Sequence, residues 1–163
     1  MDNNTDRINS ILHNELYNEY LKKIELYEAN RIYCRHNLQH FLDVARIGYI
    51  ITLEKKLNIK KDIIYAAALL HDIGRWKQYE NGTPHNIASA EQSLEILKAA
   101  GYNDNEIDEI TKAIEGHRGL NCSENKLENI ISVSDKKSRS CFYCAARESC
   151  NWTEEKRNYD IEY

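Results

Sequence analysis

Apolar positions recur at the helical period along most of the chain and predict long helices. The pattern predicts a first helix over about 8–29 and a second that begins near His36. A third, over about 60–71, contains the run 63–70, which is apolar on every side and should therefore lie at the centre of the fold. Gly74 is expected to end it. The inward positions of the second helix are His40, Val44, Ile47 and Ile51.

Three more helices follow, and each has recognisable terminal residues. The fourth is expected to begin at Pro84 with Thr83 as its N-cap, and to end at Gly101. The fifth opens with Asn103 and Glu106 in a capping-box arrangement. No segment alternates like a strand, so an all-α bundle of about six helices is predicted. The inward positions of these three helices are Ile87, Ala90, Leu94 and Leu97; Ile107, Ile110, Ile114 and His117; and Leu127, Ile131 and Asp135.

Length and composition limit the class of protein. The 163 residues, 42% of them hydrophobic, suit one domain with a substantial core. The net charge of -4 argues against a nucleic-acid binder. The apolar run 63–70 is too short to span a membrane, and the first ten residues lack a signal-peptide pattern and are expected to fray. We expect a cytoplasmic protein without nucleic-acid or membrane partners, whose five cysteines are reduced thiols or ligands.

Ionisable residues fall on the inward faces of four of the predicted helices. They are His40, the adjacent His71 and Asp72, His117, and Asp135. Burying such groups without a partner is costly, and a divalent cation satisfies imidazole and carboxylate together. A single histidine on an apolar face, or one His-Asp pair, would carry little weight. The convergence of four helices on such groups predicts a metal site.

Three short segments resemble the HD-domain phosphohydrolase superfamily. They are HFLDVA at 40–45, HDIGR at 71–75 and SDK at 134–136, and the resemblance covers about 31–139. It implies that one divalent metal is bound by four residues, which are His40, His71, Asp72 and Asp135. His36 lies four residues before the first of them, and we expect it beside the site or on the surface.

Further positions resemble a subset of the superfamily. There, histidines placed like His85 and His117 hold a second metal or contact the substrate phosphate, and Asp72 bridges the ions. The most specific resemblance is to bacterial HD-type hydrolases that split dinucleoside tetraphosphates symmetrically. At the position of Arg75, lysine is common in that family. It implies Asp72, Arg75 and His117 as catalytic residues, and Arg75, Lys136, His85 and His117 as substrate-binding residues. The one or two ions could be iron, manganese, zinc, nickel or cobalt.

These features favour a phosphohydrolase that uses a metal-activated water on a small phosphorylated substrate, a nucleotide above all. Two other hypotheses stay open: a nucleotide or metal sensor with little turnover, and an HD-fold di-iron oxygenase. The charged and aromatic tail 152–163 could pack on the body or on a partner subunit, so a homodimer also stays open.

A second candidate site lies in the C-terminal extension 140–163 of the single HD domain. Cys141, Cys144 and Cys150 have a C-x2-C-x5-C spacing, and C-x2-C is a common zinc half-site. An iron–sulfur site is conceivable. The alternative is three small, reduced cysteines buried on a C-terminal helix. A fourth ligand would have to be a histidine or another cysteine, for which the candidates are Cys34 and Cys122.

Overall fold

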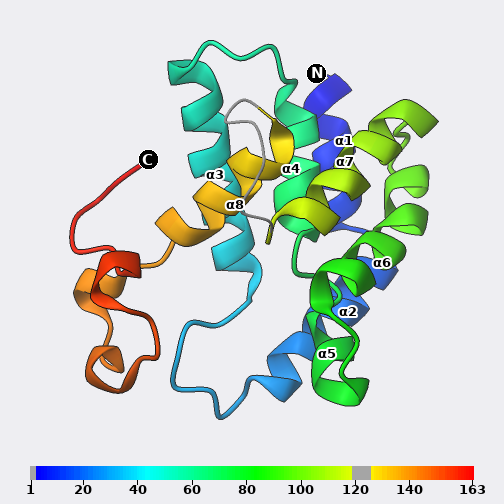
Figure 1. The fold of residues 1–163 in the computed structure, drawn as a ribbon. Helices are drawn as coiled ribbons and strands as arrows, with labels where there is room; N and C mark the ends of the chain where they lie inside the picture. The colour runs from blue at the N-terminus through cyan, green and yellow to red at the C-terminus, as the bar shows by residue number, and fades with distance from the viewer. Residues whose placement is uncertain (1–2, 119–125) are drawn as a thin grey trace.

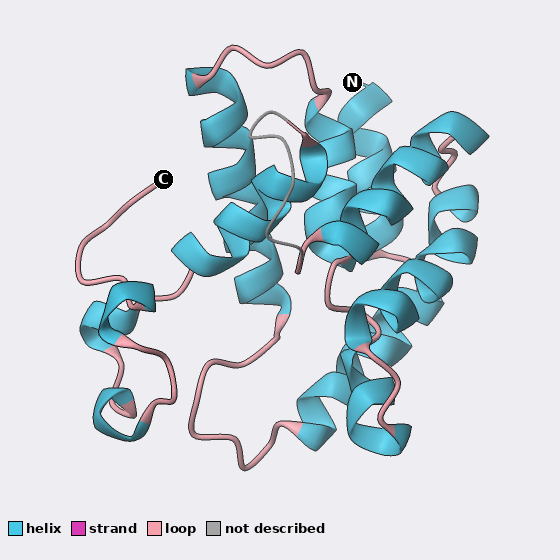
Figure 2. Ribbon diagram, viewed as in Figure 1, coloured by secondary structure: helices cyan, strands magenta, loops and turns pink. Residues whose placement is uncertain are grey.

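The all-α prediction is confirmed by a computed structural model, which describes residues 3–118 and 126–163 (Figure 1). Within these residues only helices, turns and loops occur (Figure 2). The described α-helices are α1 (Asn3–Leu12), α2 (Glu15–Tyr27), α3 (Leu38–Glu54), α4 (Lys61–Leu70), α5 (Arg75–Asn81), α6 (His85–Ala99), α7 (Asp104–Gly116) and α8 (Leu127–Lys137). They exceed the expected six because the first predicted helix is divided and α5 was not foreseen.

The N-terminal residues are tied to the body of the protein. The first predicted helix breaks at Asn14, whose side chain accepts a hydrogen bond from the Tyr17 amide and caps α2. The prediction that the first ten residues fray is wrong for residues 3–10, which lie in α1, whereas residues 1–2 lie outside the described residues. Arg7 on α1 forms ion pairs with the buried Asp62 and with Glu106, at 2.7 Å from the latter, and these contacts hold α1 against α4 and α7.

The turn between α4 and α6 contains an unpredicted helix. α4 ends at Leu70, and Gly74 does not end it but is the N-cap of the seven-residue α5. α5 has only one buried residue, Trp76, so it shows no apolar periodicity. A Cβ on Gly74 would lie 2.3 Å from the Ser89 amide nitrogen and 2.4 Å from the Ala88 carbonyl carbon. The missing side chain therefore allows this turn to approach the backbone of α6.

α4 occupies the centre, as predicted. It contacts α1, α3, α6, α7 and α8, and these helices surround it in Figure 1. The predicted inward face of α7 is buried, and its capping box between Asn103 and Glu106 is present. No helix in the described part of the chain has both the length and the apolar character needed to cross a membrane.

α6 differs from its prediction in both its start and its buried face. Its N-cap is Pro84, not Thr83, and no side chain caps it. Ile87 and Leu94 are 41% and 43% exposed, so these two predicted inward positions are wrong, whereas Ala90 and Leu97 are buried as predicted. Small residues of α6, Ala88 and Ser89, contact the turn at Gly74, because the helix and this turn lie so close together. The buried residues of α6 are His85, Ala88, Ser89, Ala90, Gln92, Ser93, Ile96 and Leu97.

The C-terminal extension contains no α-helix in the described chain. It folds into three single-turn 3-10 helices, Cys141–Tyr143, Arg147–Ser149 and Glu154–Lys156. The expectation of cysteines on a C-terminal helix is therefore wrong. The Tyr33 hydroxyl donates to the Ser149 carbonyl, so the extension contacts the segment that joins α2 to α3.

Candidate metal centre

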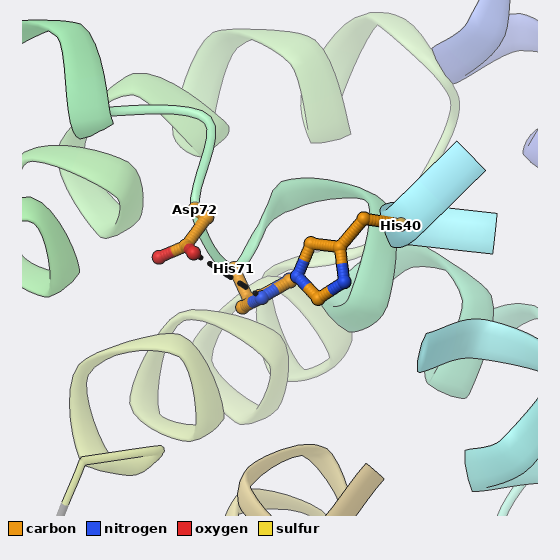
Figure 3. A group of neighbouring side chains, drawn as sticks. All are labelled: His40, His71 and Asp72. Carbon is orange, nitrogen blue, oxygen red and sulfur yellow. Dashed lines mark ion pairs between the residues drawn. The ribbon is translucent and has the colours of Figure 1, made fainter. Parts of the chain in front are cut away.

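His71 and Asp72 lie at the carboxyl end of α4, in the interior of the protein. They are 0% and 2% exposed. The Ala68 carbonyl can only accept a hydrogen bond, so His71 Nδ1 carries the proton and donates to it at 2.7 Å. The Nε2 lone pair of His71 therefore faces the neighbouring side chains, with Asp72 Oδ2 3.6 Å away (Figure 3).

His40 reaches the same place from the first turn of α3. Its Nδ1 is 3.1 Å from the Ser138 hydroxyl, which in turn donates to the Asp135 carbonyl. This chain fixes Nδ1 as the donor, so Nε2 carries the lone pair; metal-binding histidines are oriented in the same way by a hydrogen bond at their other nitrogen. Figure 3 shows the His40 and His71 rings beside each other, with the Asp72 carboxylate next to His71.

The four residues that the sequence predicted as ligands meet, and Asp135 lies at the edge of the group. Ligand atoms of His40, His71 and Asp72 all fall within 4.8 Å of one another. Asp135 Oδ1 is 3.1 Å from His40 Nε2 and 3.9 Å from His71 Nε2. Side chains from α3, from the end of α4 and from α8 therefore converge, as the predicted inward positions of these helices indicated.

Asp72 also belongs to a second group, with His85 and His117. Its Oδ1 is 3.1 Å from His85 Nε2 and 3.9 Å from His117 Nε2, whereas its Oδ2 faces His71. His117 donates from Nδ1 to the Ile114 carbonyl, so its Nε2 lone pair also points inward. One carboxylate thus presents one oxygen to each group of histidines.

Two atoms of these groups are buried without a hydrogen-bond partner among the described residues. They are His71 Nε2 and Asp72 Oδ1. His85 Nδ1 lies 2.5 Å from Gln78 Oε1, which accepts its proton, so an Nε2 lone pair faces Asp72 Oδ1 at 3.1 Å. Two such acceptors repel each other unless a cation lies beside both. The residues therefore fit a divalent ion, and imidazole with carboxylate suits a first-row transition metal.

The electrostatics keep most of these groups in their ligating forms. Burial lowers the pKa of His40 to about 4 and that of His85 to about 3. Burial alone would raise the pKa of Asp72, but His71 and other nearby cations hold it well below its usual range. For His71, burial is outweighed by Asp72 and Asp135, and the pKa rises. A proton on His71 therefore competes with a metal ion for the same lone pair.

Of the two positions expected for His36, the one beside the site is confirmed and the one on the surface is wrong. It is 5% exposed, and its Nε2 lies 3.7 Å from Asp72 Oδ2. Its Nδ1 lies 2.5 Å from the buried carboxylate of Glu28, which also accepts a hydrogen bond from the Tyr79 hydroxyl. Glu28 was not predicted, because its role depends on the position of the end of α2 in the fold.

Arg139 is a second side chain that sequence reasoning missed. Its Nη2 donates to His40 Nε2 at 2.9 Å and to Asp135 Oδ1 at 3.2 Å. Its Nη1 donates to the Arg35 carbonyl, which holds the guanidinium in place. Arg139 follows Asp135 by four residues and so shares its helical face, a spacing that could have identified it.

The two cations that the sequence proposed for phosphate differ in position. Arg75 is beside the centre: its Nη1 is 3.6 Å from Asp72 Oδ2, and its Nε donates to the Tyr79 hydroxyl. Lys136 is exposed, and its Nζ lies 3.4 Å from Ser132 Oγ on the same helix. Arg139, which lies just beyond the end of α8, rather than Lys136 is thus the cation that touches the ligand groups.

Comparison with known proteins places this arrangement in a family. The sequence model of the HD domain matches residues 37–140, which is more than half of the chain and includes all six proposed ligands. The chain belongs to the HD-domain family. A crystal structure of a predicted HD superfamily hydrolase from an uncultured Thermotogales bacterium has the same fold, with a TM-score of 0.64 and 23% identity over 88% of this chain and 79% of that one.

Related sequences extend the comparison of this HD domain. An uncharacterized protein from Clostridium beijerinckii is 48% identical over 97% of this chain and 99% of its own length. A deoxyguanosinetriphosphate triphosphohydrolase-like protein from Clostridium tetani is 31% identical over 76% of this chain but only 34% of its own. Ribonuclease Y from Mycoplasma mycoides is 31% identical over 78% of this chain and 23% of its own. These relatives support the superfamily but not the finer resemblance to dinucleoside-tetraphosphate hydrolases.

Proposed function

We propose that this HD domain is a metal-dependent hydrolase of small phosphorylated molecules, with nucleotides as its substrates. The observation that carries the proposal is the double role of Asp72, whose two oxygens face two separate groups of histidines. This arrangement suits two ions that share one carboxylate. His40, His71 and Asp135 would complete the first ion's ligands, and His85 and His117 those of the second.

The chemistry follows from what phosphate hydrolysis requires. A bound divalent ion makes its coordinated water far more acidic and neutralises charge on a phosphate oxygen. Asp72, held ionised by its cationic neighbours, accepts a hydrogen bond from the attacking water and orients it. Its burial keeps bulk water away from the oxygen that does so.

Arg75 supplies the positive charge for the substrate. The guanidinium stands 3.6 Å from Asp72 and 3.4 Å from His85, so a phosphate at the centre falls within reach of its planar fork. His117 adds a hydrogen bond or a ligand. Lys136, on the exposed side of α8, contacts only a part of the substrate that projects outward.

A nucleotide agrees with the charge of the chain and with the names of its relatives. The net charge of -4 disfavours long nucleic acids, and the deoxyguanosinetriphosphate triphosphohydrolase-like relative carries a nucleotide in its name. Dinucleoside polyphosphates belong to the same chemical class. The ribonuclease Y relatives make a short RNA the natural competing substrate to test.

The test is a screen of the full chain with Mn²⁺, Fe²⁺, Co²⁺ or Ni²⁺. The substrates are nucleoside mono-, di- and triphosphates, dinucleoside polyphosphates and a short RNA, and products are identified by chromatography. We expect release of nucleoside phosphates from a small nucleotide. Arg75→Ala should lose at least about tenfold in kcat/KM. Arg46→Ala, an exposed arginine of α3, is the matched control and should keep wild-type activity.

Several results would overturn the proposal. Tight nucleotide binding without product identifies a sensor, and substrate-dependent oxygen uptake identifies an oxygenase. Cleavage of RNA alone would make the protein a nuclease. Equal activity of Arg75→Ala and wild type would remove Arg75 from substrate binding.

A further inference from the structure

Four cysteines from two distant parts of the chain gather at one end of the molecule. Cys34 lies between α2 and α3, whereas Cys141, Cys144 and Cys150 lie in the C-terminal extension. In Figure 1 these two segments lie on the same side of the bundle, below and beside α8. The hydrogen bond from the Tyr33 hydroxyl to the Ser149 carbonyl joins the two segments next to Cys34 and Cys150, although its partners are 116 positions apart in the sequence.

A cavity lies between the two segments. Its volume is about 260 Å³, and its lining includes Cys34, Cys141 and Cys144. His40 and Arg139 form part of the same wall. These three thiols therefore line a space that adjoins the histidine centre, because His40 forms part of both.

Two backbone hydrogen bonds lie at the cysteines of the extension. The amide of Trp152 donates to Cys150 Sγ at 3.5 Å. The amide of Cys144 donates to the Cys141 carbonyl and closes a tight turn over the C-x2-C pair. Both cysteines of the pair line the same cavity, and C-x2-C is a common zinc half-site.

The extension has almost no apolar core of its own. Phe142, Tyr143 and Ile161 are 45%, 90% and 78% exposed, and Cys141 is its one buried hydrophobic residue. Three single-turn helices cannot hold one another without such a core. Small irregular segments of this kind are commonly held by disulfides or a structural metal.

The charges around Cys34 also favour a bound cation. Burial raises the pKa of the Cys34 thiol, Arg139 opposes this rise, and the nearness of Cys141, Cys144 and Cys150 adds to it. Cys34 therefore lies near enough to the other three sulfurs for their negative charge to oppose its own. A divalent cation among them would remove that repulsion.

We propose that Cys34, Cys141, Cys144 and Cys150 form a tetrathiolate Zn²⁺ site that fastens the C-terminal extension to the segment between α2 and α3. Each thiol gives its proton to solvent as it binds. Among the described residues, only the two histidine groups have three ligand atoms within 4.8 Å of one another. Binding therefore draws the sulfurs closer together, a movement that short turns without a packed core can accommodate.

The test measures zinc, iron and acid-labile sulfide in the full chain, purified under reducing conditions. All comparisons are made in an Asp72→Ala background, which disables the histidine centre. This protein should retain one zinc per chain. Adding Cys141→Ser with Cys144→Ser should remove that zinc, and so should Cys34→Ser. Adding Cys122→Ser is the matched control, because Cys122 lies outside the described residues and is not a proposed ligand; it should leave the zinc in place.

A second measurement needs no cysteine variant, so misfolding cannot obscure the answer. Titrating the wild-type thiols with a mercurial reagent should release one zinc per chain to a colorimetric indicator. Cobalt exchanged into the site should show a thiolate-to-cobalt charge-transfer band. Zinc retained by the Cys141→Ser, Cys144→Ser protein, zinc lost from the Cys122→Ser protein, iron with sulfide in place of zinc, or no zinc at all would overturn the proposal. None of these outcomes bears on hydrolysis at the histidine centre.

Discussion

Replacing Gly74 with alanine tests whether the close approach between α6 and the turn that follows α4 places His85 beside Asp72. The added Cβ would lie 2.3 Å from the Ser89 amide nitrogen, whereas ordinary contact begins at 3.4 Å. The obstructing atoms are the backbone of a helix, so no side-chain rotation relieves the overlap. α6 must withdraw by about 1 Å, because protein interiors are close-packed.

The energetic cost can be worked from three contributions. Overpacking costs roughly 1–3 kcal/mol, and a backbone overlap belongs at the upper end. Weakening the hydrogen bond from the Gly74 amide to Ser89 Oγ, now 2.9 Å, adds about 1 kcal/mol. Alanine makes the unfolded chain less flexible than glycine does, and this effect offsets up to about 1 kcal/mol of the loss. The net loss is about 2–3 kcal/mol, or roughly 5–10 °C in Tm.

Function should suffer along with stability. As α6 withdraws by about 1 Å, the 3.1 Å separation between His85 and Asp72 grows to about 4 Å, which distorts the second group of ligands. Metal affinity should fall by at least about tenfold. Circular dichroism melting and a metal titration measure the two effects on the same sample.

Gly116→Ala is the matched control for this experiment. Its Cβ meets the flexible carboxylate of Glu128 at 3.1 Å, so stability should change by less than about 0.5 kcal/mol. If Gly74→Ala melts and binds metal like Gly116→Ala, the close approach does not position His85 and the reasoning fails.

Three further predictions concern single contacts. The Arg7 hydrogen bond holds the pKa of Glu106 at about 2. The ionised carboxylate therefore contributes up to about 3 kcal/mol to the free energy of unfolding above pH 4.5, and this contribution is lost as the pH falls from 4.5 towards 2. Glu106→Gln should lack this acid dependence in urea unfolding, and a constant difference from wild type at all pH values would contradict the assignment. Asn103→Ala removes the cap of α7 and should cost about 1 kcal/mol by urea unfolding, and an unchanged midpoint would refute the capping role. Arg139→Ala frees the lone pair of His40 and should tighten Mn²⁺ binding about fivefold, whereas weaker binding would show that Arg139 supports the site.

The central helices and most of the ligand set follow from the sequence because the same pattern encodes both. Apolar positions at the helical period determine which faces of α3, α4, α7 and α8 turn inward. His40, His71, His117 and Asp135 lie on or beside those faces, and the fold brings them together. Periodicity is informative here because these helices bury large aliphatic side chains.

The features that escaped prediction depend on tertiary position. Two inward positions of α6, Ile87 and Leu94, were wrongly predicted because Gly74 brings that helix so close that alanine and serine make the contact in place of large side chains. Glu28 ends a surface helix, and nothing in its local sequence indicates that it meets His36 in the interior. The gathering of Cys34 with the C-terminal cysteines likewise depends on a loop whose path no periodic pattern determines.

The central claim is that Asp72 is the shared ligand of a metal centre. Titration with Mn²⁺, followed by electron paramagnetic resonance, tests it directly, because Mn²⁺ prefers oxygen and imidazole ligands over thiolates. The wild-type chain and Asp43→Ala, which changes a partly exposed carboxylate on α3, should both bind Mn²⁺. Asp72→Ala should show only free Mn²⁺ over the same range. Equal binding by Asp72→Ala and wild type would contradict the account.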